Sequence, residues 1–440
     1  MTSREPAWEL GAQSYIEKTP PVRKGGKVVS VVGTLVRVIG LQLRIGDLCR
    51  IYSSASDAGL LGEVIGIDNS QMIVMPLGKM IGLSSASIVE ATGSGILIPQ
   101  ASALMGRVVD GFCRPLDKRP MTDPCTQSVV GSIPSPLSRP IIDEVFVTGV
   151  AAIDALLTVG VGQRVGIFAP AGVGKTSLLS MLASFASVDA VVVALIGERG
   201  REVQEFIHSG LGADTFEHSV VVVATSDRSA AERIKAAHTA SAIAEELRGK
   251  GKRVLLLFDS LTRFARALRE VGLAVGEPPA RRGFPPSVFA ALPELLERSG
   301  RDESGSITAF YTVLAEDEDG SDPICEEARS LLDGHIVLSS DLAATGHYPA
   351  IDILASKSRV MQNICDTVHL SMAGRIRRWM ADYKKSELLI RLGEYKEGAD
   401  RELDVAVQKK EPISDLLRQA SGDFMAWERT RDAMQQLAMA

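Results

Sequence analysis

The most constraining feature of the sequence is the segment Ala169–Thr176, which reads APAGVGKT. An apolar run that predicts a strand precedes it, and a stretch with helical periodicity follows, which is the context that a phosphate-binding loop requires. Gly172 and Gly174 let the backbone curl so that its N–H groups point at phosphate oxygens, and the following helix adds its positive N-terminal end. Lys175 is expected to reach the β- and γ-phosphates of a nucleotide, and the Thr176 hydroxyl is expected to bind Mg²⁺.

The loop therefore predicts a domain that binds a nucleoside triphosphate. It departs mildly from the usual pattern, because its first position is Ala169 rather than glycine. The residues expected to contact the nucleotide phosphates are Gly172, Val173, Gly174, Lys175, Thr176 and Ser177.

Predicted strands and helices alternate around this loop. The buried strands are expected at Arg164–Ala169, Ala190–Ile196, Ser219–Ala224, Arg253–Asp259, Ser306–Leu314 and His335–Leu338. Helical stretches such as Thr176–Phe185, Ala230–Arg248 and Pro286–Arg298 lie between them. This alternation predicts an α/β fold with a mostly parallel sheet covered by helices.

The sequence pattern changes on both sides of this region. Residues 26–95 contain short β-branched runs separated by turn residues, which predicts a small β-barrel. Residues 96–372 form the expected nucleotide domain, with a Pro-rich connector at 114–140 that we expect to be an extended strap. Residues 373–440 have helical periodicity and predict a small C-terminal helical domain, and residues 1–25 are expected to be a loosely held N-terminal segment.

Two carboxylates lie at or just after the carboxyl ends of predicted strands. Asp259 ends the apolar run Val254–Asp259, and a carboxylate there can bind Mg²⁺ through water. Glu198 lies in Ile196–Glu202, directly after another predicted strand, where it could orient the attacking water and accept its proton. By spacing alone, a solvated charged turn explains Glu198 equally well.

Composition limits the class of protein. The net charge of −6 argues against a nucleic-acid protein that depends on bulk positive charge. The five cysteines include no C-x-x-C pair, which fits a reducing compartment. The N-terminus lacks the apolar core of a signal peptide, and the apolar runs are far shorter than the roughly 20 residues of a membrane span. We therefore expect a cytoplasmic protein, peripheral to a membrane at most.

Taken together, these segments resemble the type III secretion and flagellar export ATPases, which are relatives of the catalytic subunit of rotary ATP synthases. The resemblance extends from about Gly26 to about Gln419 and is most specific in Ser306–Leu314 and Asp333–Leu338. The run Leu388–Tyr395 favours the virulence type over the flagellar type. The resemblance implies a RecA-like P-loop domain between an N-terminal β-barrel and a C-terminal helical domain.

The resemblance also implies roles for particular residues. It implies that Glu198 is the general base and that Arg199 and Arg263 lie close to the phosphates. It implies that Arg359 is an arginine finger that enters the neighbouring subunit's site, and that Tyr348 stacks on the adenine ring. The family usually carries Glu-Gly-Asp-Asp after the strand that ends at Leu314; here residues 316–320 read EDEDG, so no role is assigned to these carboxylates.

The implied machine is a homohexamer that hydrolyses ATP with Mg²⁺ at the cytoplasmic base of a type III secretion apparatus, peripheral to the inner membrane. Its implied partners are a central stalk protein, a peripheral stator protein, an export-gate membrane protein and chaperone–substrate complexes, with no nucleic acid. Loop Gly276–Pro286 would line the pore, and turn Glu394–Asp400 would meet the stalk. The implied work is chaperone release, unfolding and export of secreted proteins.

Other functions remain open at this point. A flagellar export ATPase and a catalytic subunit of a rotary proton-translocating ATPase would share this organisation. A hexameric RNA translocase would need basic and aromatic groups on the barrel, where Tyr52 is the only aromatic residue between Lys27 and Gly95. A non-catalytic nucleotide-binding scaffold would not need Glu198.

Overall fold

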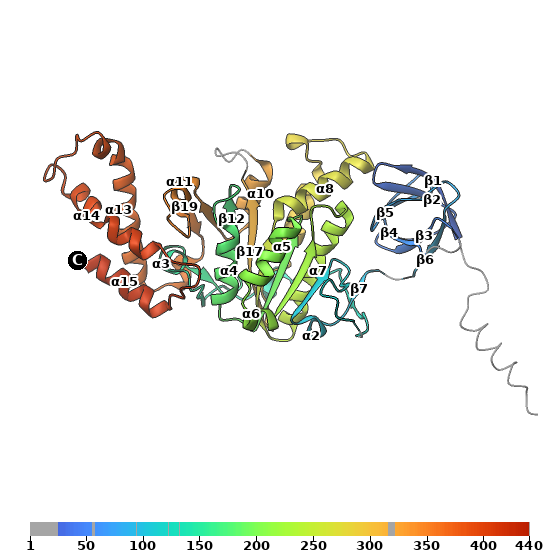
Figure 1. The fold of residues 1–440 in the computed structure, drawn as a ribbon, viewed down its shortest axis with the longest axis horizontal. Helices are drawn as coiled ribbons and strands as arrows, with labels where there is room; N and C mark the ends of the chain where they lie inside the picture. The colour runs from blue at the N-terminus through green and yellow to red at the C-terminus, as the bar shows by residue number, and fades with distance from the viewer. Residues whose placement is uncertain are drawn as a thin grey trace, which may run out of the picture. The chain divides into compact units, whose positions relative to one another are not determined.

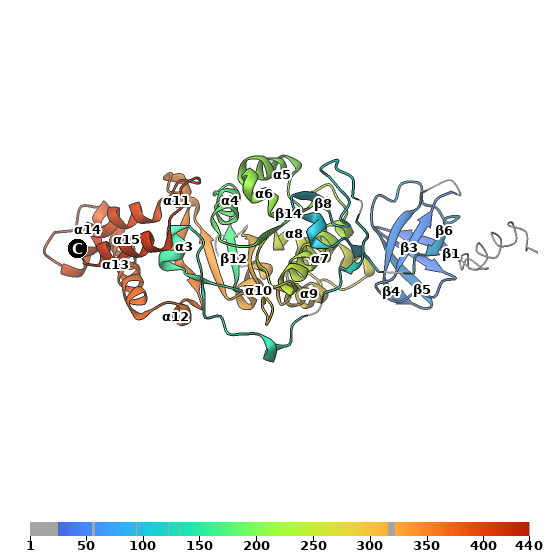
Figure 2. The same ribbon diagram turned by 90° about the horizontal axis from the view of Figure 1, so that it is seen from below.

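The computed structural model describes residues 25–54, 58–93, 95–121, 123–131, 133–315 and 322–439. The ribbon is drawn from two sides in Figures 1 and 2. The chain divides into two compact units, Met1–Ile96 and Leu97–Ala440, which we describe separately. Except for residue 25, the predicted N-terminal segment 1–25 lies outside the described residues, and so does the acidic loop 316–320.

The first unit is a closed antiparallel barrel with the strand order β1-β2-β5-β4-β3-β6. Its strands are β1 (Gly25–Val32), β2 (Leu35–Ile39), β3 (Leu48–Tyr52), β4 (Leu60–Asp68), β5 (Gln71–Pro76) and β6 (Ile88–Ala91). Alternate β-branched side chains such as Val36, Val38 and Val74 are fully buried and fill the interior. The predicted small barrel is confirmed, and its closure by β6 was not predicted because β6 is short.

The second unit is built on a mixed sheet with the order β19-β18-β12-β17-β15-β13-β14-β8, and β16 pairs with β17. Its strands are β8 (Arg107–Asp110), β12 (Arg164–Ala169), β13 (Ala190–Ile196), β14 (Ser219–Ala224), β15 (Arg253–Asp259), β16 (Gly300–Arg301), β17 (Ser306–Leu314), β18 (Gly334–Leu338) and β19 (Ile351–Ser358). The pairings from β8 to β18 are parallel, and β19 pairs antiparallel with β18. The predicted mostly parallel sheet is confirmed.

Helices cover both faces of this sheet. Figure 2 shows α4 (Lys175–Phe185), α5 (Gly200–Glu205) and α6 (Ala213–Glu217) on one side, and α7 (Ala230–Gly249), α9 (Pro286–Leu296) and α10 (Pro323–Leu331) on the other. The remaining helices of this region are α2 (Ala101–Leu104), α3 (Ala151–Leu156), the π-helix η2 (Phe206–Gly210), α8 (Leu261–Val275), the 3₁₀ turn η3 (Arg281–Gly283), α11 (Ser340–Ala344) and α12 (Met361–Ile364). Burial on both faces explains why the strands read as continuous apolar runs rather than alternating ones.

The Pro-rich connector carries little regular structure. It holds β9 (Gln127–Ser128), which pairs with β7 (Leu97–Ile98), and the 3₁₀ turn η1 (Pro136–Ser138); β10 (Val145–Phe146) and β11 (Val159–Gly160) pair further on. Figure 2 shows it as a teal strap along the outside of the unit. Arg139 fastens it by donating to the carbonyl oxygens of Glu297 and Ser299.

The C-terminal bundle consists of α13 (Thr367–Arg391), α14 (Arg401–Leu417) and α15 (Trp427–Met439). Buried side chains of the bundle, including Ile376, Ile413 and Met434, belong to the same apolar core as Leu156 of α3 and the central strands. The bundle is therefore packed directly onto the nucleotide domain. Among the helices that the structure describes, none is long and apolar enough to cross a membrane.

Candidate active site

The phosphate loop connects the carboxyl end of β12 to the first residue of α4. Gly172 and Gly174 both have positive φ values, +81° and +88°, which other residues rarely adopt. Val173 between them is buried and anchors the loop to the core. A Cβ on Gly174 would come within 3.2 Å of Tyr348 Cε1, so the Tyr348 ring lies against the loop. The backbone thus has the curled form that exposes N–H groups to an anion.

The loop lysine is held by the two predicted carboxylates. Lys175 Nζ donates to Asp259 Oδ1 at 2.6 Å and approaches Glu198 Oε1 at 3.5 Å. Neighbouring strands cause this meeting, because β13 pairs with β15 in a register that places Leu195 opposite Asp259. Glu198 is only 8% exposed and Asp259 only 4%, so both charges lie in a largely dry site.

This environment changes the protonation of the cluster. Burial, together with the negative charge of Asp259, raises the pKa of Glu198 to about 7 although Lys175 opposes the shift. Burial by itself would lower the pKa of Lys175, but the charges of Asp259 and Glu198 outweigh it and raise that pKa. Lys175 therefore stays a cation, and Glu198 has a pKa in the range where a carboxylate can take up and release a proton near neutral pH.

The two predicted arginines differ in their surroundings. Arg263 lies against Gly197, where a Cβ would come within 2.9 Å of Arg263 Cβ. Its Nε is buried and has no hydrogen-bond partner among the residues that the structure describes, so a donor beside the Glu198 loop is left without an acceptor. Arg199 is largely exposed and pairs with Glu202 at 3.4 Å. The orphaned Arg263 donor fits a site that receives an anionic ligand.

The residues predicted to bind Mg²⁺ supply suitable atoms. A carboxylate from Asp259 and a hydroxyl from the exposed Thr176 are the hard oxygen donors that this cation prefers. Within the described ranges, no group of three or more His, Cys, Asp or Glu side chains could hold a metal ion. A divalent cation here would therefore depend on phosphate and water oxygens for the rest of its shell, as is usual for Mg²⁺ at nucleotide sites.

Arg359 lies at the amino ends of the parallel strands β12 and β18, whereas the phosphate loop lies at the carboxyl end of β12. Its backbone N–H donates to Asp333 O at 2.9 Å, and its exposed guanidinium donates to Arg329 O at 2.8 Å. Gly334 of β18 pairs with both Val165 of β12 and Ser358 of β19, so Arg359 is level with the first residues of β12, with β18 between them. The loop follows the last residue of β12, so the length of a whole strand, about 17 Å at 3.3 Å per residue, separates them.

Two further polar residues of the site were not predicted from sequence. Thr312 of β17 is fully buried and donates its hydroxyl to Asp259 Oδ1 at 2.6 Å. A polar threonine inside the apolar run Ser306–Leu314 could have drawn attention to this position. Its contact with Asp259, however, depends on β17 lying beside β15, which the local sequence pattern does not reveal. Gln419, in the connector between α14 and α15, donates its backbone N–H to Tyr348 O at 2.8 Å.

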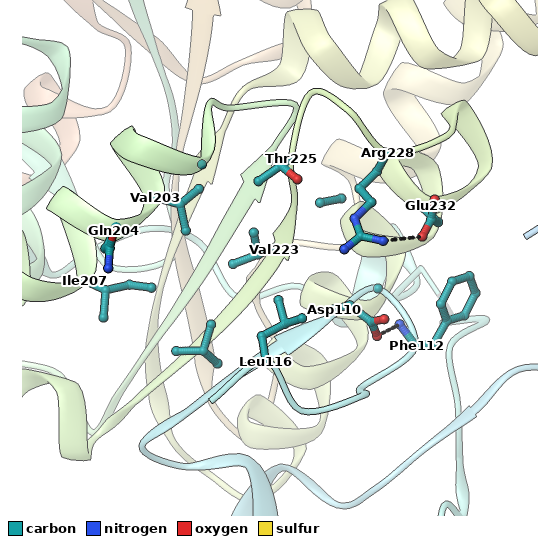
Figure 3. A pocket seen from close by; sticks show the side chains of 14 residues that line it. Asp110, Phe112, Leu116, Val203, Gln204, Ile207, Val223, Thr225, Arg228 and Glu232 are labelled. Atoms are coloured by element: carbon teal, nitrogen blue, oxygen red, sulfur yellow. Dashed lines mark hydrogen bonds and ion pairs between the residues drawn. The ribbon is translucent and has the colours of Figure 1, made fainter. Parts of the chain in front are cut away.

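A separate cavity lies next to the segment that carries Glu198. It has a volume of about 300 Å³, and Figure 3 shows side chains of β8, α5, β14 and α7 around it. Its apolar wall includes Leu116, Val203 and Val223, and its rim includes Arg228 and Glu232, which pair at 3.7 Å. Among the described residues that line it, none belongs to the phosphate loop. We therefore do not assign the nucleotide to this cavity.

Family models match most of the chain. Residues 28–93 match the β-barrel domain of the ATP synthase alpha/beta family, and residues 149–358 match its nucleotide-binding domain. Residues 365–436 match the T3SS EscN ATPase C-terminal domain. The fold, the phosphate loop and these matches define a nucleotide-binding ATP hydrolase with the ATP synthase alpha/beta architecture.

Individual relatives narrow the class. The type 3 secretion system ATPase of Xanthomonas euvesicatoria is 48% identical over 435 residues, which cover 99% of this chain and 98% of the relative. The flagellum-specific ATP synthase of Bacillus subtilis is 45% identical over 424 residues, 96% of this chain and 97% of the relative. The solved structure of assembled EscN from enteropathogenic E. coli superposes with a TM-score of 0.90 at 46% identity, covering 94% of this chain and all of EscN.

The chain belongs to the type III secretion system ATPase family, with flagellar export ATPases as near relatives. The family, the fold class and the enzyme class predicted from the sequence are confirmed.

Proposed function

We propose that this chain hydrolyses MgATP to drive protein export through a type III secretion apparatus. We propose further that this apparatus is of the virulence type and not the flagellar type. The observation that carries the proposal is the contact of Lys175 with both Asp259 and Glu198 beside the phosphate loop. One buried cluster thus holds a cation for the phosphates (Lys175), a carboxylate for Mg²⁺ (Asp259) and a carboxylate for the attacking water (Glu198). The match of residues 365–436 to the C-terminal domain of EscN supports the virulence type.

In the proposed mechanism, the loop N–H groups bind the phosphate oxygens, and Lys175 exchanges its carboxylate partners for the β- and γ-phosphates. Thr176 and Asp259 would hold Mg²⁺, whose chemistry is to neutralise charge on the β- and γ-oxygens. Thr312 keeps Asp259 oriented through its 2.6 Å hydrogen bond. Glu198 orients the attacking water and accepts its proton, and its raised pKa makes it a stronger base than an ordinary glutamate.

Positive groups and an aromatic ring complete the proposed site. Arg263 donates its orphaned N–H toward the phosphate region, and Arg199 becomes available there once it leaves Glu202. Tyr348, which lies on Gly174, stacks on the adenine base. Arg359 serves the neighbouring subunit, since its own phosphate loop lies at the other edge of the sheet.

The proposed assembly is a homohexamer at the cytoplasmic side of the inner membrane. EscN has been solved assembled and also in complex with its central stalk EscO, and the latter structure superposes with a TM-score of 0.86 at 45% identity. We propose the same kind of stalk for this chain, together with a stator, an export gate and chaperone–substrate complexes. ATP turnover would release chaperones and prepare secreted proteins for export.

Stalk addition tests this function. Adding the central stalk protein of the same secretion apparatus is expected to raise ATP turnover several-fold, because the stalk stabilises the ring in which sites are shared. Phosphate release measured at constant ATPase concentration reports the change, with the Glu198→Gln variant as the background. Stimulation by the stalk of the flagellar export apparatus alone would assign the chain to flagella, and stimulation by single-stranded RNA alone would contradict an export role.

The protonation of Glu198 predicts a pH dependence. A general base acts only when deprotonated, and the pKa of Glu198 is raised to about 7. The quantity to measure is kcat/KM, because it reports the protonation of the free enzyme. We expect kcat/KM to increase as pH rises through about 7, and to decrease nearly tenfold for each pH unit below that value. Circular dichroism at each pH controls for unfolding. A flat profile between about pH 5.5 and 7.5 would contradict the proposed protonation of Glu198.

A further inference from the structure

Gln419 is a buried amide that joins the C-terminal bundle to the nucleotide domain. It lies in the connector between α14 and α15 and is 7% exposed. Its Oε1 accepts from Ala151 N at 2.9 Å, and its Nε2 donates to Gly149 O at 2.8 Å and to Asp423 O. Both ends of the amide are thus engaged, and two of the partners lie about 270 residues earlier in the chain.

The same residue also holds the turn that carries Tyr348. The Gln419 backbone N–H donates to Tyr348 O at 2.8 Å. One turn earlier, Ser414 Oγ lies 3.4 Å from Nδ1 of His347, the residue before Tyr348. The Tyr348 ring in turn lies against Gly174 of the phosphate loop. A continuous chain of contacts therefore runs from the Gln419 amide to the ring beside the loop.

A second contact fixes the connector to the phosphate-loop helix. The rings of Phe424 and Phe185, the last residue of α4, meet edge to face with centroids 5.8 Å apart. Gly149 lies beneath them with a φ of +70°, and a Cβ there would come within 2.7 Å of both phenylalanines. The connector therefore packs closely against Gly149, and the Gln419 amide forms a hydrogen bond with the Gly149 carbonyl at the same place.

We propose that Gln419 is a positioning residue for base recognition: its amide fixes the connector on residues 149–151 and thereby holds the Tyr348 carbonyl and ring in place for the adenine base. The inference rests on the proposed function, in which Tyr348 stacks on adenine. A ring that is ordered before the ligand arrives loses less conformational freedom on binding, so affinity rises without a new contact. Without the amide, Ala151 N–H loses its partner in a buried place, and the connector shifts to relieve it.

The loss of the Gln419 amide is expected to weaken binding of the adenine base and not of the phosphates. Gln419 contacts the Tyr348 turn, whereas the triphosphate is held by the loop glycines, Lys175 and Thr176. Replacing Gln419 with methionine keeps most of the side-chain volume and removes the amide. Gln419→Met should raise the KM for ATP about tenfold and change kcat less than twofold. Its Kd for the magnesium complex of inorganic triphosphate should stay within twofold of wild type.

Isothermal titration of the full-length chain with ATP and with inorganic triphosphate, beside steady-state kinetics, measures these quantities. Ser421→Ala is the matched control, because Ser421 is an exposed residue of the same connector and its side chain has no hydrogen bond among the described residues. If Gln419→Met does not fold, Gln419→Asn, which keeps the amide but shortens its reach, should show the same selective loss. Equal loss of ATP and triphosphate affinity in either variant, or no loss of either, overturns the inference.

Tyr348→Ala separates this inference from the proposed function. If Tyr348→Ala lowers ATP affinity but not triphosphate affinity while the Gln419 variants do neither, Tyr348 binds the base and Gln419 does not position it. If Tyr348→Ala leaves the ratio of ATP affinity to triphosphate affinity unchanged, Tyr348 is not the base-stacking residue, and the inference about Gln419 fails with it.

Discussion

Replacing Glu198 with glutamine is expected to abolish ATP turnover while ATP still binds with an affinity within about twofold of wild type. The carboxamide has nearly the same size as the carboxylate, and its oxygen can still accept from Lys175 Nζ, which lies 3.5 Å from Glu198 Oε1. It cannot take a proton from the attacking water, and general-base catalysis contributes roughly 10²–10⁴ in rate. Fluorescent-nucleotide titration measures the affinity, and a phosphate-release assay measures the turnover.

A second substitution in the same cluster gives the control. Lys175→Ala should weaken ATP binding instead, because it removes the cation that faces the phosphates. It also leaves the Asp259 carboxylate, which accepts from Lys175 at 2.6 Å, with the Thr312 hydroxyl as its only hydrogen-bond donor among the described residues. The two variants thus separate binding from chemistry. Hydrolysis by Glu198→Gln at the wild-type rate would remove Glu198 from the mechanism.

The sequence predicted most reliably what depends on neighbours along the chain. Ala169–Thr176 carries its own conformation, since Gly172 and Gly174 occupy positive φ and α4 begins at once. The central strands were recognisable because burial on both faces leaves an uninterrupted apolar run. Strands such as β8 and β19 were missed: β8 spans only Arg107–Asp110, and β19 alternates buried and exposed residues at the edge of the sheet.

What the sequence could not supply is the order of the strands. Asp259 and Thr312 meet because β15 pairs with β17, and Glu198 reaches Lys175 because β13 lies beyond β15. Gln419 contacts Gly149 across 270 positions, with no local pattern in its favour. These contacts come from tertiary packing, which a reading of periodicity along one chain does not determine. The resemblance to a known family named Glu198 and Arg359, but it did not reveal Thr312 or Gln419.

Replacing Arg359 is expected to slow ATP hydrolysis as much as replacing the general base Glu198. The reason is that Arg359 is proposed to act in the site of a neighbouring subunit. Arg359 is level with the first residues of β12, one strand away across β18, whereas the phosphate loop follows the last residue of β12. If the subunits form a ring as proposed, we expect that guanidinium to serve a neighbour's nucleotide. An arginine supplied across an interface stabilises the charge that develops on the transferred phosphoryl group and is worth about 10³–10⁵ in rate. Arg359→Ala should therefore bind ATP normally and hydrolyse it poorly.

If the site is shared between subunits as proposed, activity is a property of the assembly. Turnover per chain should rise with protein concentration as subunits meet, and sedimentation velocity on the same samples shows whether the rise follows ring formation. The exposed guanidinium in the single chain bonds only backbone carbonyls of Arg329 and Ser330 among the described residues, so little must be broken when it enters a neighbour's site.

Mixing two inactive variants supplies the decisive measurement. Lys175→Ala subunits lack the loop cation but keep the finger, and Arg359→Ala subunits keep the loop and lack the finger. In a mixed ring, some interfaces pair an intact loop with an intact Arg359, so hydrolysis should partly recover relative to either variant alone. Mixing Arg359→Ala with Glu198→Gln should recover activity in the same way, because each again retains the half-site that the other has lost. Wild-type turnover by Arg359→Ala, or turnover per chain that stays constant from dilute monomer to ring, would show that each subunit completes its own site.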